Sequence, residues 1–502
     1  MGSVPDVLTS MKRFEPALIL TGAILLVVLV DATRARWRDV AGRILTVGGL
    51  LLALVRSVEL RGVSAEIFGG MAIVDPLGSF FQALLIAASL LIVLAFTFRN
   101  SRELHGLGQG EFYALLLAVT LSNVLLATAN DLAMLYLALE MVSITSYVMV
   151  AYMKGDRMSN EASLKYILFG AVSTGAMLYG LSLLYGLTGT TSVPAIRNAL
   201  AAGIADANPL AISTIALLVF SGFGFKTATV PFHFWCPDVY QGAPTPVTAF
   251  LSVAPKAAGF AIMTRFFYTG LAAPRTGPWD LAGTIDWVHV LMVISVLSMT
   301  VGNVAALTQT NMKRLLAYSS IAHAGYIMMG VVALSQNGAR ALMIYLLAYL
   351  VMNLGAFLVV TLIHLHDGTF DLRDYPGLYR RSPFLTLAMA VFLLSLMGIP
   401  PLVGFMGKLY VFAAIVERGR SYFWYAAVGA VNAAIAAYYY ARVLKTMIID
   451  NPPAEKPPFR LALADATWVW ILLLGNVLPL LWWARIDGWA RSSLSLYAGP
   501  PS

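Results

Sequence analysis

The chain has 502 residues, of which 59% are hydrophobic and only 12% are charged, and its mean hydropathy of +0.78 excludes a water-soluble fold with a surface of ordinary polarity. A single cysteine, Cys236, excludes disulfides within the chain and a thiolate metal cluster. The net charge of +8 does not indicate nucleic-acid binding, because the basic residues are spread over short loops between apolar stretches, as membrane orientation requires.

Apolar stretches long enough to cross a bilayer recur along the whole chain. A spanning helix needs roughly 20 apolar residues, and on this criterion we predict an all-α polytopic membrane protein with about 14 transmembrane helices. The first stretch lacks the flanks of a cleaved signal peptide, so we expect a retained helix. In chain order the predicted spans cover residues 15–31, 41–58, 70–98, 112–129, 131–152, 163–187, 209–235, 242–270, 286–308, 313–334, 339–364, 383–416, 421–446 and 464–484.

The distribution of lysine and arginine predicts the orientation of the chain. Counted over alternate loops, starting with the loop of Arg34, Arg36, Arg38 and Arg43, one side holds 17 of the 33 basic residues and the other holds 11. The excess places the first loop in the cytoplasm and both termini on the outer side. The remaining five basic residues lie inside spans: Lys165, Lys226, Lys256, Arg265 and Lys408.

Two stretches are too long to be one plain helix. Between Asp206 and Asp238 lie 31 residues whose only formal charge is Lys226, and 35 residues between Arg381 and Glu417 contain only Lys408. As straight helices they would be about 46 and 52 Å long, against a hydrocarbon core of about 30 Å.

Each of these stretches contains residues that break a helix. Proline removes a backbone donor and glycine lets the chain leave helical geometry, so we predict two discontinuous helices. Such a pair indicates a transporter with internal repeats, which we place at 112–270 and 286–446, after N-terminal helices at 1–111 and before a C-terminal helix and tail at 464–502. The breaking residues are Gly222, Gly224 and Pro231 around Lys226, and Gly398, Pro400, Pro401, Gly404 and Gly407 before Lys408.

Ionisable residues at bilayer depth are functional candidates, because each costs at least roughly 2.5–3.5 kcal/mol on insertion scales. Burial can lower the pKa of a lysine to about 5–6 and raise that of a glutamate to about 8–9, which brings both groups toward neutral pH. We therefore predict a path for protons through such residues. A pair such as Glu140 with Lys226 would hold its ions together until a charge shift at the next neighbour weakened it. The candidates are Glu140, Lys165, Lys226, Lys256, His323 and Lys408.

Structural alternatives exist for these candidates. The three central lysines could snorkel to an interface, Glu140 could form a structural ion pair, and Lys165 could anchor the chain at the interface. His323 could hydrogen-bond a backbone carbonyl. We expect Arg265 to snorkel near a helix end, and the spacing of His364 and His366 indicates a solvated loop and not a metal site.

Other motifs do not indicate catalysis. Gly222 and Gly224 lack the context of a nucleotide-binding loop, and we find no Ser-His-Asp, metal or flavin constellation. We interpret Asp75 and Asp131 as helix-start or loop residues. Several tryptophans near span ends fit an interfacial belt, namely Trp235, Trp287, Trp424, Trp482 and Trp483.

Four sequence strings resemble the antiporter-like membrane subunits of NADH:quinone oxidoreductase, respiratory complex I. They are SNEASLKYILFGA, GFGFKTATVPFHFWCPDVYQGAPTPVTAFLS, TQTNMKRLLAYSSIAHAGY and MGIPPLVGFMGKLY. The resemblance covers roughly residues 70–450 and is greatest to the N type, also called subunit 2, and to its photosynthetic counterpart. It implies 14 helices with two inverted five-helix repeats, each containing a broken helix.

The resemblance also implies roles for the candidate residues. Glu140 matches the glutamate that pairs with the broken-helix lysine, and Lys226 matches that lysine. Lys256 matches the central lysine of the hydrated axis, with Lys165 and His323 as contributors. Lys408 matches the terminal lysine, where the M type has glutamate. The chain stops soon after its last span, so we expect no long lateral helix of the L type.

The function implied by the resemblance is proton translocation without redox chemistry in this chain. FMN, iron-sulfur clusters and the quinone site would lie in partners, which would be the M- and L-type antiporter-like subunits, the small K, J and A types and the peripheral redox arm. The location implied is a bacterial inner membrane. An Mrp-type sodium/proton antiporter subunit is the alternative function, and a subunit that only bridges its neighbours is a third.

Overall fold

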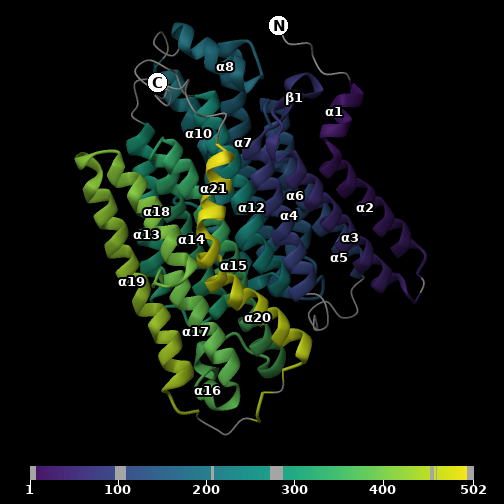
Figure 1. The fold of residues 1–502 in the computed structure, drawn as a ribbon, viewed down its shortest axis with the longest axis vertical. Helices are drawn as coiled ribbons and strands as arrows, with labels where there is room; N and C mark the ends of the chain where they lie inside the picture. Colours follow the sequence, from purple (N-terminus) through teal and green to yellow (C-terminus); the bar gives the residue numbers. More distant parts are fainter. Residues whose placement is uncertain are drawn as a thin grey trace.

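A computed structural model describes residues 7–34, 36–96, 109–204, 209–271, 287–452, 457–459 and 461–494. The terminal tails, including the end of the predicted C-terminal segment, lie outside this part. The described chain is a bundle of long helices (Figure 1) with one small hairpin, in which β1 (Ala65–Ile67) pairs antiparallel with β2 (Ala72–Val74). The prediction of an all-α membrane fold is confirmed apart from this hairpin.

The N-terminal half of the bundle contains the first broken helix. Its helices are α1 (Val7–Arg13), α2 (Glu15–Ala32), α3 (Arg38–Glu59), α4 (Pro76–Phe96), α5 (Gln109–Thr128), α6 (Leu132–Val150), α7 (Arg157–Thr188), α8 (Val193–Ala199), α10 (Pro209–Thr227), α11 (Trp235–Gly242) and α12 (Thr245–Arg265). The chain leaves helical geometry between α10 and α11, at residues 228–234, where the sequence predicts the break.

The C-terminal half contains the second broken helix. Its helices are α13 (Trp287–Ala306), α14 (Met312–Val332), α15 (Gln336–Asp367), α16 (Leu378–Arg381), α17 (Pro383–Met397), α18 (Val403–Glu417), α19 (Phe423–Ile448), α20 (Leu463–Val477) and α21 (Trp483–Ser492). The break lies between α17 and α18, at residues 398–402. Both discontinuous helices predicted from the sequence are therefore present.

Twelve helices in the described ranges are long and apolar enough to span a membrane. They correspond to twelve of the predicted spans. The other two predicted spans coincide with the broken helix of α17 and α18 and with α19, which has 26 residues. The total of 14 spans and the four segments proposed from the sequence stay predictions.

Local signals in the two halves match closely. Asp131 caps α6 by accepting a hydrogen bond from a backbone N–H, and Asn311 does the same for α14. Each cap residue also forms a backbone bridge to the segment that follows the next helix, at Ser192 and Asp371 respectively. Those two segments lead to α8 and α16, which lie at opposite ends of the bundle (Figure 1). The parallels support the predicted inverted repeat, which stays a prediction.

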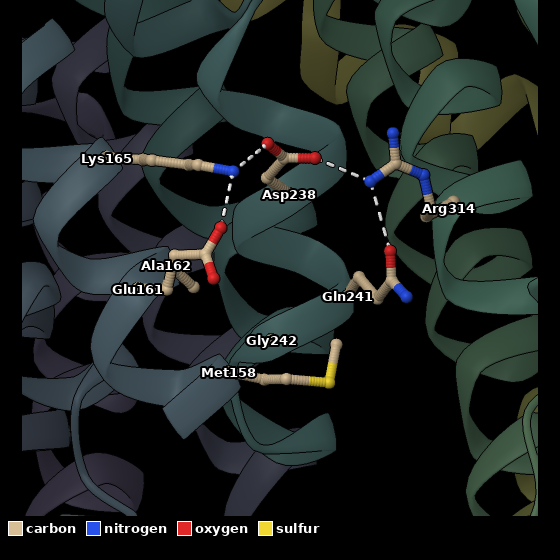
Figure 2. A pocket seen from close by; sticks show the side chains of 8 residues that line it. All are labelled: Met158, Glu161, Ala162, Lys165, Asp238, Gln241, Gly242 and Arg314. Carbon is tan, nitrogen blue, oxygen red and sulfur yellow. Dashed lines mark hydrogen bonds and ion pairs between the residues drawn. The ribbon is translucent and has the colours of Figure 1, made fainter. Parts of the chain in front are cut away.

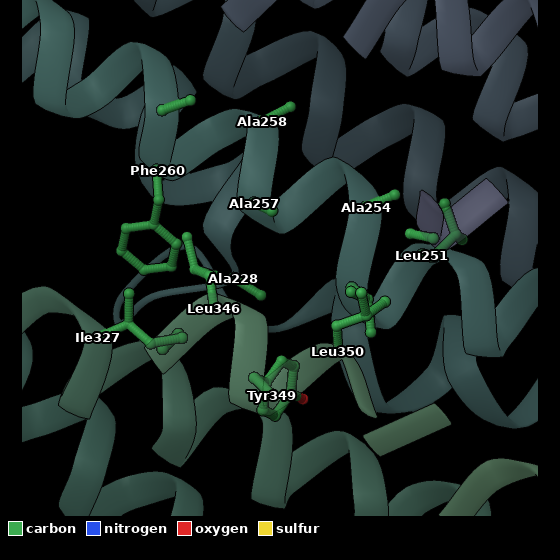
Figure 3. Packing of buried hydrophobic residues seen from close by; sticks show 14 of the residues in the cluster. Ala228, Leu251, Ala254, Ala257, Ala258, Phe260, Ile327, Leu346, Tyr349 and Leu350 are labelled. Atoms are coloured by element: carbon green, nitrogen blue, oxygen red, sulfur yellow. The ribbon is translucent and has the colours of Figure 1, made fainter. Parts of the chain in front are cut away.

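Helix α12 lies at the centre of the bundle, and every one of its residues is buried. Small side chains such as Ala254 and Ala257 let it approach its neighbours closely. Figure 3 draws these alanines in one cluster of buried hydrophobic residues with Ile327 of α14 and with Leu346 and Leu350 of α15. Helices α14 and α15 therefore pack directly beside the helix that holds Lys256.

Arg265, at the end of α12, does not snorkel as the sequence predicted. It is 2% exposed and forms a bidentate ion pair with Asp75, with Nη1 to Oδ2 at 2.7 Å and Nη2 to Oδ1 at 2.8 Å. Asp75 also accepts a hydrogen bond from the Gly78 N–H at the start of α4, so it is a helix-start residue with a second partner. The prediction for Arg265 was wrong because it used only the position of the residue near a helix end. The carboxylate partner, Asp75, lies 190 residues away in the sequence.

Two of the five tryptophans assigned to an interfacial belt also differ from the prediction. Trp235 and Trp287 are buried inside the bundle, whereas Trp424 and Trp482 are exposed. Trp235 donates a hydrogen bond to the backbone carbonyl of Phe225 across the first helix break. A buried indole usually needs such a partner for its N–H.

Candidate functional site

Lys226 lies in the last turn of α10, directly before the first helix break. Its side chain is 1% exposed, and Nζ donates a hydrogen bond to Ser143 Oγ on α6 at 2.9 Å. The negative end of the α10 dipole favours a cation at this position. Gly259 of α12 lies so close that an added Cβ would come within 3.1 Å of Lys226 Cγ. The broken helix therefore holds its lysine against two neighbouring helices.

Glu140 lies one turn before Ser143 on α6 and is half-buried. The ion pair expected between Glu140 and Lys226 is not among the salt bridges within 4.0 Å in the described ranges, since the Ser143 hydroxyl accepts from the ammonium instead. The carboxylate still interacts electrostatically with Lys226, and the Tyr136 hydroxyl interacts with it as well. The structure thus places the two groups near one another without direct contact.

Lys256 occupies the middle of α12 and is 3% exposed. Nζ donates a hydrogen bond to Ser320 Oγ of α14 at 2.5 Å and lies 5.7 Å from the centroid of the Tyr240 ring. One turn earlier on the same helix, Ser252 accepts a hydrogen bond from Asn353 of α15 at 2.6 Å. Polar contacts at bilayer depth therefore tie α12 to both α14 and α15.

Lys408 lies on α18 and reaches back across the second helix break. It is 5% exposed, and Nζ donates to the carbonyl oxygen of Met397, the last residue of α17, at 2.7 Å. The next residue, Gly398, has a φ of +86°, and an added Cβ would lie 2.7 Å from Lys408 Cδ. Both lysines are therefore associated with the C-terminal, negative end of the first part of a broken helix: Lys226 belongs to the last turn of α10, and the Lys408 ammonium contacts the last carbonyl of α17.

His323 lies on α14, where the charges of Lys256 and Lys408 both act on it. Nδ1 is 2.9 Å from the Tyr345 hydroxyl of α15, and Nε2 is 3.4 Å from the Tyr440 hydroxyl of α19. The ring interacts electrostatically with both Lys256 and Lys408. The alternative of a hydrogen bond to a backbone carbonyl is not what the structure shows, because both ring nitrogens face side-chain hydroxyls.

Lys226, Lys256 and Lys408, three of the four lysines that are buried in the described ranges, have neutral partners. Within the described ranges none of Lys226, Lys256 and Lys408 forms a salt bridge within 4.0 Å, whereas the equally buried Arg265 is paired with a carboxylate. Hydroxyl and carbonyl acceptors stabilise an ammonium less than a carboxylate does. Such a lysine can lose its proton without leaving an uncompensated buried anion. The arrangement suits groups that change protonation state.

Lys165 does not belong to this buried set. It is 39% exposed on α7 and contacts Glu161 at 2.9 Å and Asp238 at 2.7 Å. Figure 2 shows Asp238 between Lys165 and Arg314, with Gln241 also bonded to the arginine. The cluster lines a cavity of about 240 Å³ at the end of α11. The exposure and the ion pairs of Lys165 fit the alternative of an interfacial anchor.

Several residues of the site were not identified from the sequence. Ser143 follows Glu140 by three residues and Ser320 precedes His323 by three, a spacing that places each pair on one helix face. This spacing could have identified both serines. The two tyrosines that contact His323 come from distant helices, and no local pattern marks them among the 22 tyrosines of the chain.

A family model described as NADH:quinone oxidoreductase/Mrp antiporter, TM matches residues 129–435. The chain belongs to this family. Among its relatives, NADH-quinone oxidoreductase subunit N of Anaeromyxobacter sp. (strain Fw109-5) is 45% identical over 520 residues and covers 99% of both chains. NAD(P)H-quinone oxidoreductase subunit 2 of Synechococcus sp. (strain JA-3-3Ab) is 45% identical over 439 residues, which cover 87% of this chain and 80% of the relative.

Solved structures share the antiporter-family fold. A chain of respiratory complex I from Thermus thermophilus with bound Aureothin is 32% identical, with a TM-score of 0.76 and coverage of 94% of this chain and 98% of that chain. A chain of the Mrp complex from Dietzia sp. DQ12-45-1b has a TM-score of 0.82 at 20% identity, over 97% and 98% of the two chains. The latter likeness concerns the fold alone.

Proposed function

We propose that this chain is the proton-translocating, antiporter-like membrane subunit of an NADH-quinone oxidoreductase, and that it moves protons through its buried lysines. The identity of 45% to subunit N over nearly the full length supports this assignment. The chain carries out no redox step itself. It is part of an enzyme because the proton transfer it performs is driven by electron transfer to quinone in the same complex.

The observation that carries the proposal is that Lys226, Lys256 and Lys408 are buried and form no salt bridge with a carboxylate in the described part of the chain. Lys226 and Lys408 lie at the two helix breaks, and Lys256 lies on the central helix between them. An unpaired charge at bilayer depth is costly and marks a functional group. Stability alone does not explain these three buried lysines, because apolar residues of similar size would stabilise the fold equally well or better.

Proton transfer would proceed between these groups in steps. A proton leaving Lys226 removes a positive charge next to Glu140, and the changed field acts on Lys256 through the low-dielectric interior. Ser320, which accepts a hydrogen bond from Lys256 of α12, lies three residues before His323 on α14, so Lys256 contacts the face of α14 that carries the imidazole. His323 then connects electrostatically to Lys408. Protonation of one group thereby changes the proton affinity of the next.

The partners and the orientation belong to the same proposal. FMN, iron-sulfur clusters and quinone would be bound by other subunits, which would include M-, L-, K-, J- and A-type membrane subunits and the peripheral arm. The chain would lie in a bacterial inner membrane with its termini on the outer side, as the loop charges predict. Lys165 would then lie at the cytoplasmic end, where Asp238 and Glu161 form a solvated charged cluster.

The test uses the assembled complex in inverted membrane vesicles. Lys226→Met and Lys408→Met should lower NADH-driven proton pumping at least about tenfold while the complex still assembles, because methionine keeps the volume but holds no proton. Lys445→Met is the control, since Lys445 is 62% exposed and pairs with Asp450 at the surface. An unchanged proton-to-electron ratio in both test variants would refute the proposal and favour a subunit that only bridges its neighbours.

The second candidate function is that of an Mrp-type sodium/proton antiporter subunit, because the matching family model covers both classes. Co-purification separates the two. The flavin and iron-sulfur absorption of a redox arm should accompany the chain through purification if it belongs to the oxidoreductase. Sodium-dependent proton exchange in vesicles without any electron donor would instead favour the antiporter.

A further inference from the structure

The surroundings of His323 differ from those of the three lysines, because both of its ring nitrogens face tyrosine hydroxyls. Tyr345 of α15 is 2.9 Å from Nδ1, and Tyr440 of α19 is 3.4 Å from Nε2. Tyr440 also shares a hydrogen bond of 2.5 Å with Ser319, which lies four residues before His323 on α14. All four side chains are buried. The imidazole is thus held between two other helices.

Hydroxyl partners have a property that carbonyl or ammonium partners lack. A neutral imidazole has one N–H donor and one acceptor nitrogen, and a tyrosine hydroxyl can either donate or accept. A backbone carbonyl only accepts, so it would hold the proton on one nitrogen. With Tyr345 and Tyr440 on its two sides, His323 can keep both hydrogen bonds in either tautomer, because the hydroxyl hydrogens can rotate.

This property matters for a group that passes protons. An imidazole that takes a proton at one nitrogen and releases the other proton from the second nitrogen ends in the opposite tautomer. A buried nitrogen without a partner is costly, so a fixed partner would penalise one of the two states. We infer that Tyr345 and Tyr440 are positioning residues that keep both tautomers of His323 accessible, so that protons can pass through it; this inference rests on the proposed function.

The second contact of Tyr345 links this arrangement to the terminal lysine. Its ring lies so close to Gly407 of α18 that an added Cβ would come within 3.2 Å of it. Gly407 directly precedes Lys408, so a movement of α18 would act on the ring that contacts His323. The groups that face His323 are Lys256 from α12, Lys408 from α18, Tyr326 from α14, Tyr345 and Tyr349 from α15, and Tyr440 from α19.

The experiment replaces single hydroxyls in the whole complex and measures NADH-driven proton pumping in vesicles across a range of pH. Tyr345→Phe and Tyr440→Phe should each lower pumping about tenfold. Their pumping optimum should move toward acid by up to about one pH unit, because a protonated imidazole donates from both nitrogens and needs both hydroxyls. Tyr439→Phe is the matched control, since this buried neighbour donates to Asn303 and not to His323.

A double-substitution cycle separates positioning from a general structural role. In a His323→Gln background, Tyr345→Phe and Tyr440→Phe should cause no further loss, because the group that they serve is gone. If that background does not assemble, the pH profiles of the single variants still decide. If Tyr345→Phe and Tyr440→Phe both pump like Tyr439→Phe at an unchanged optimum, while Lys226→Met and Lys408→Met lower pumping at least about tenfold, the inference is overturned and the proposed function stands. Normal pumping in those lysine variants would overturn the proposed function itself.

Discussion

Gly398 lies directly against the side chain of Lys408, and Gly398→Ala should separate the lysine from its acceptor. At a φ of +86° an added Cβ would lie 2.7 Å from Lys408 Cδ and 3.4 Å from Cε. The backbone strain of an L residue there is about 1–2 kcal/mol. The close contact between the added Cβ and Lys408 has a second effect, because the flexible lysine must move away. It then loses its hydrogen bond to the Met397 carbonyl, which is worth about 1.5–3 kcal/mol for a charged donor.

The control for this substitution is Gly368→Ala. Gly368 ends α15 with a φ of +73° and has nothing within 4 Å of the position of a Cβ, so it shares the backbone strain without the contact to a lysine. We expect both variants to assemble to a similar extent on native gels, while NADH-driven proton pumping falls about tenfold only in Gly398→Ala. Equal pumping in the two variants would refute the role of the contact between Gly398 and Lys408.

Two further substitutions test the ion pairs. Arg265→Met should destabilise the folded chain by about 3–5 kcal/mol, because it leaves Asp75 charged and buried; thermal unfolding of the purified complex measures this, and the double variant with Asp75→Leu should recover most of the loss. Asp238→Asn should leave assembly intact and change pumping less than about threefold, because ion pairs exposed like those of Lys165 and Arg314 contribute about 0.2–1 kcal/mol. A tenfold loss of pumping would instead place this cluster on the proton path.

The broken helices could be predicted from the sequence because two independent signals coincide there. Lys226 and Lys408 are each the only formal charge in a stretch longer than the bilayer is thick, and glycine and proline lie beside both. The same reasoning predicted that both lysines are buried, because a charge in the middle of so long an apolar stretch is expected inside the bundle and not against lipid. Lys256 was found by its position in the middle of a predicted span. These features depend on neighbours along the chain, which a sequence displays directly.

The partners of these charges could not be predicted, because they depend on which helices meet. The sequence suggested Glu140 as the direct partner of Lys226, but the acceptor is Ser143, one turn away on the same helix. The pair of Arg265 and Asp75 joins residues 190 positions apart. No periodicity or composition relates positions so distant in the sequence. The pair forms because α4 packs against α12, and this packing is visible only in the folded structure.

The complete burial of α12 has a consequence for the role of the lipid. A helix that faces lipid adjusts its tilt and depth to the thickness of the bilayer. Helix α12 presents no lipid-facing surface, because all residues of its apolar stretch are buried. In the apolar stretch of α7, by comparison, 39% of the residues are buried. The depth of Lys256 is therefore fixed by protein contacts, among them Arg265 at the end of the helix. Pumping through this lysine should accordingly tolerate membranes of different acyl-chain length.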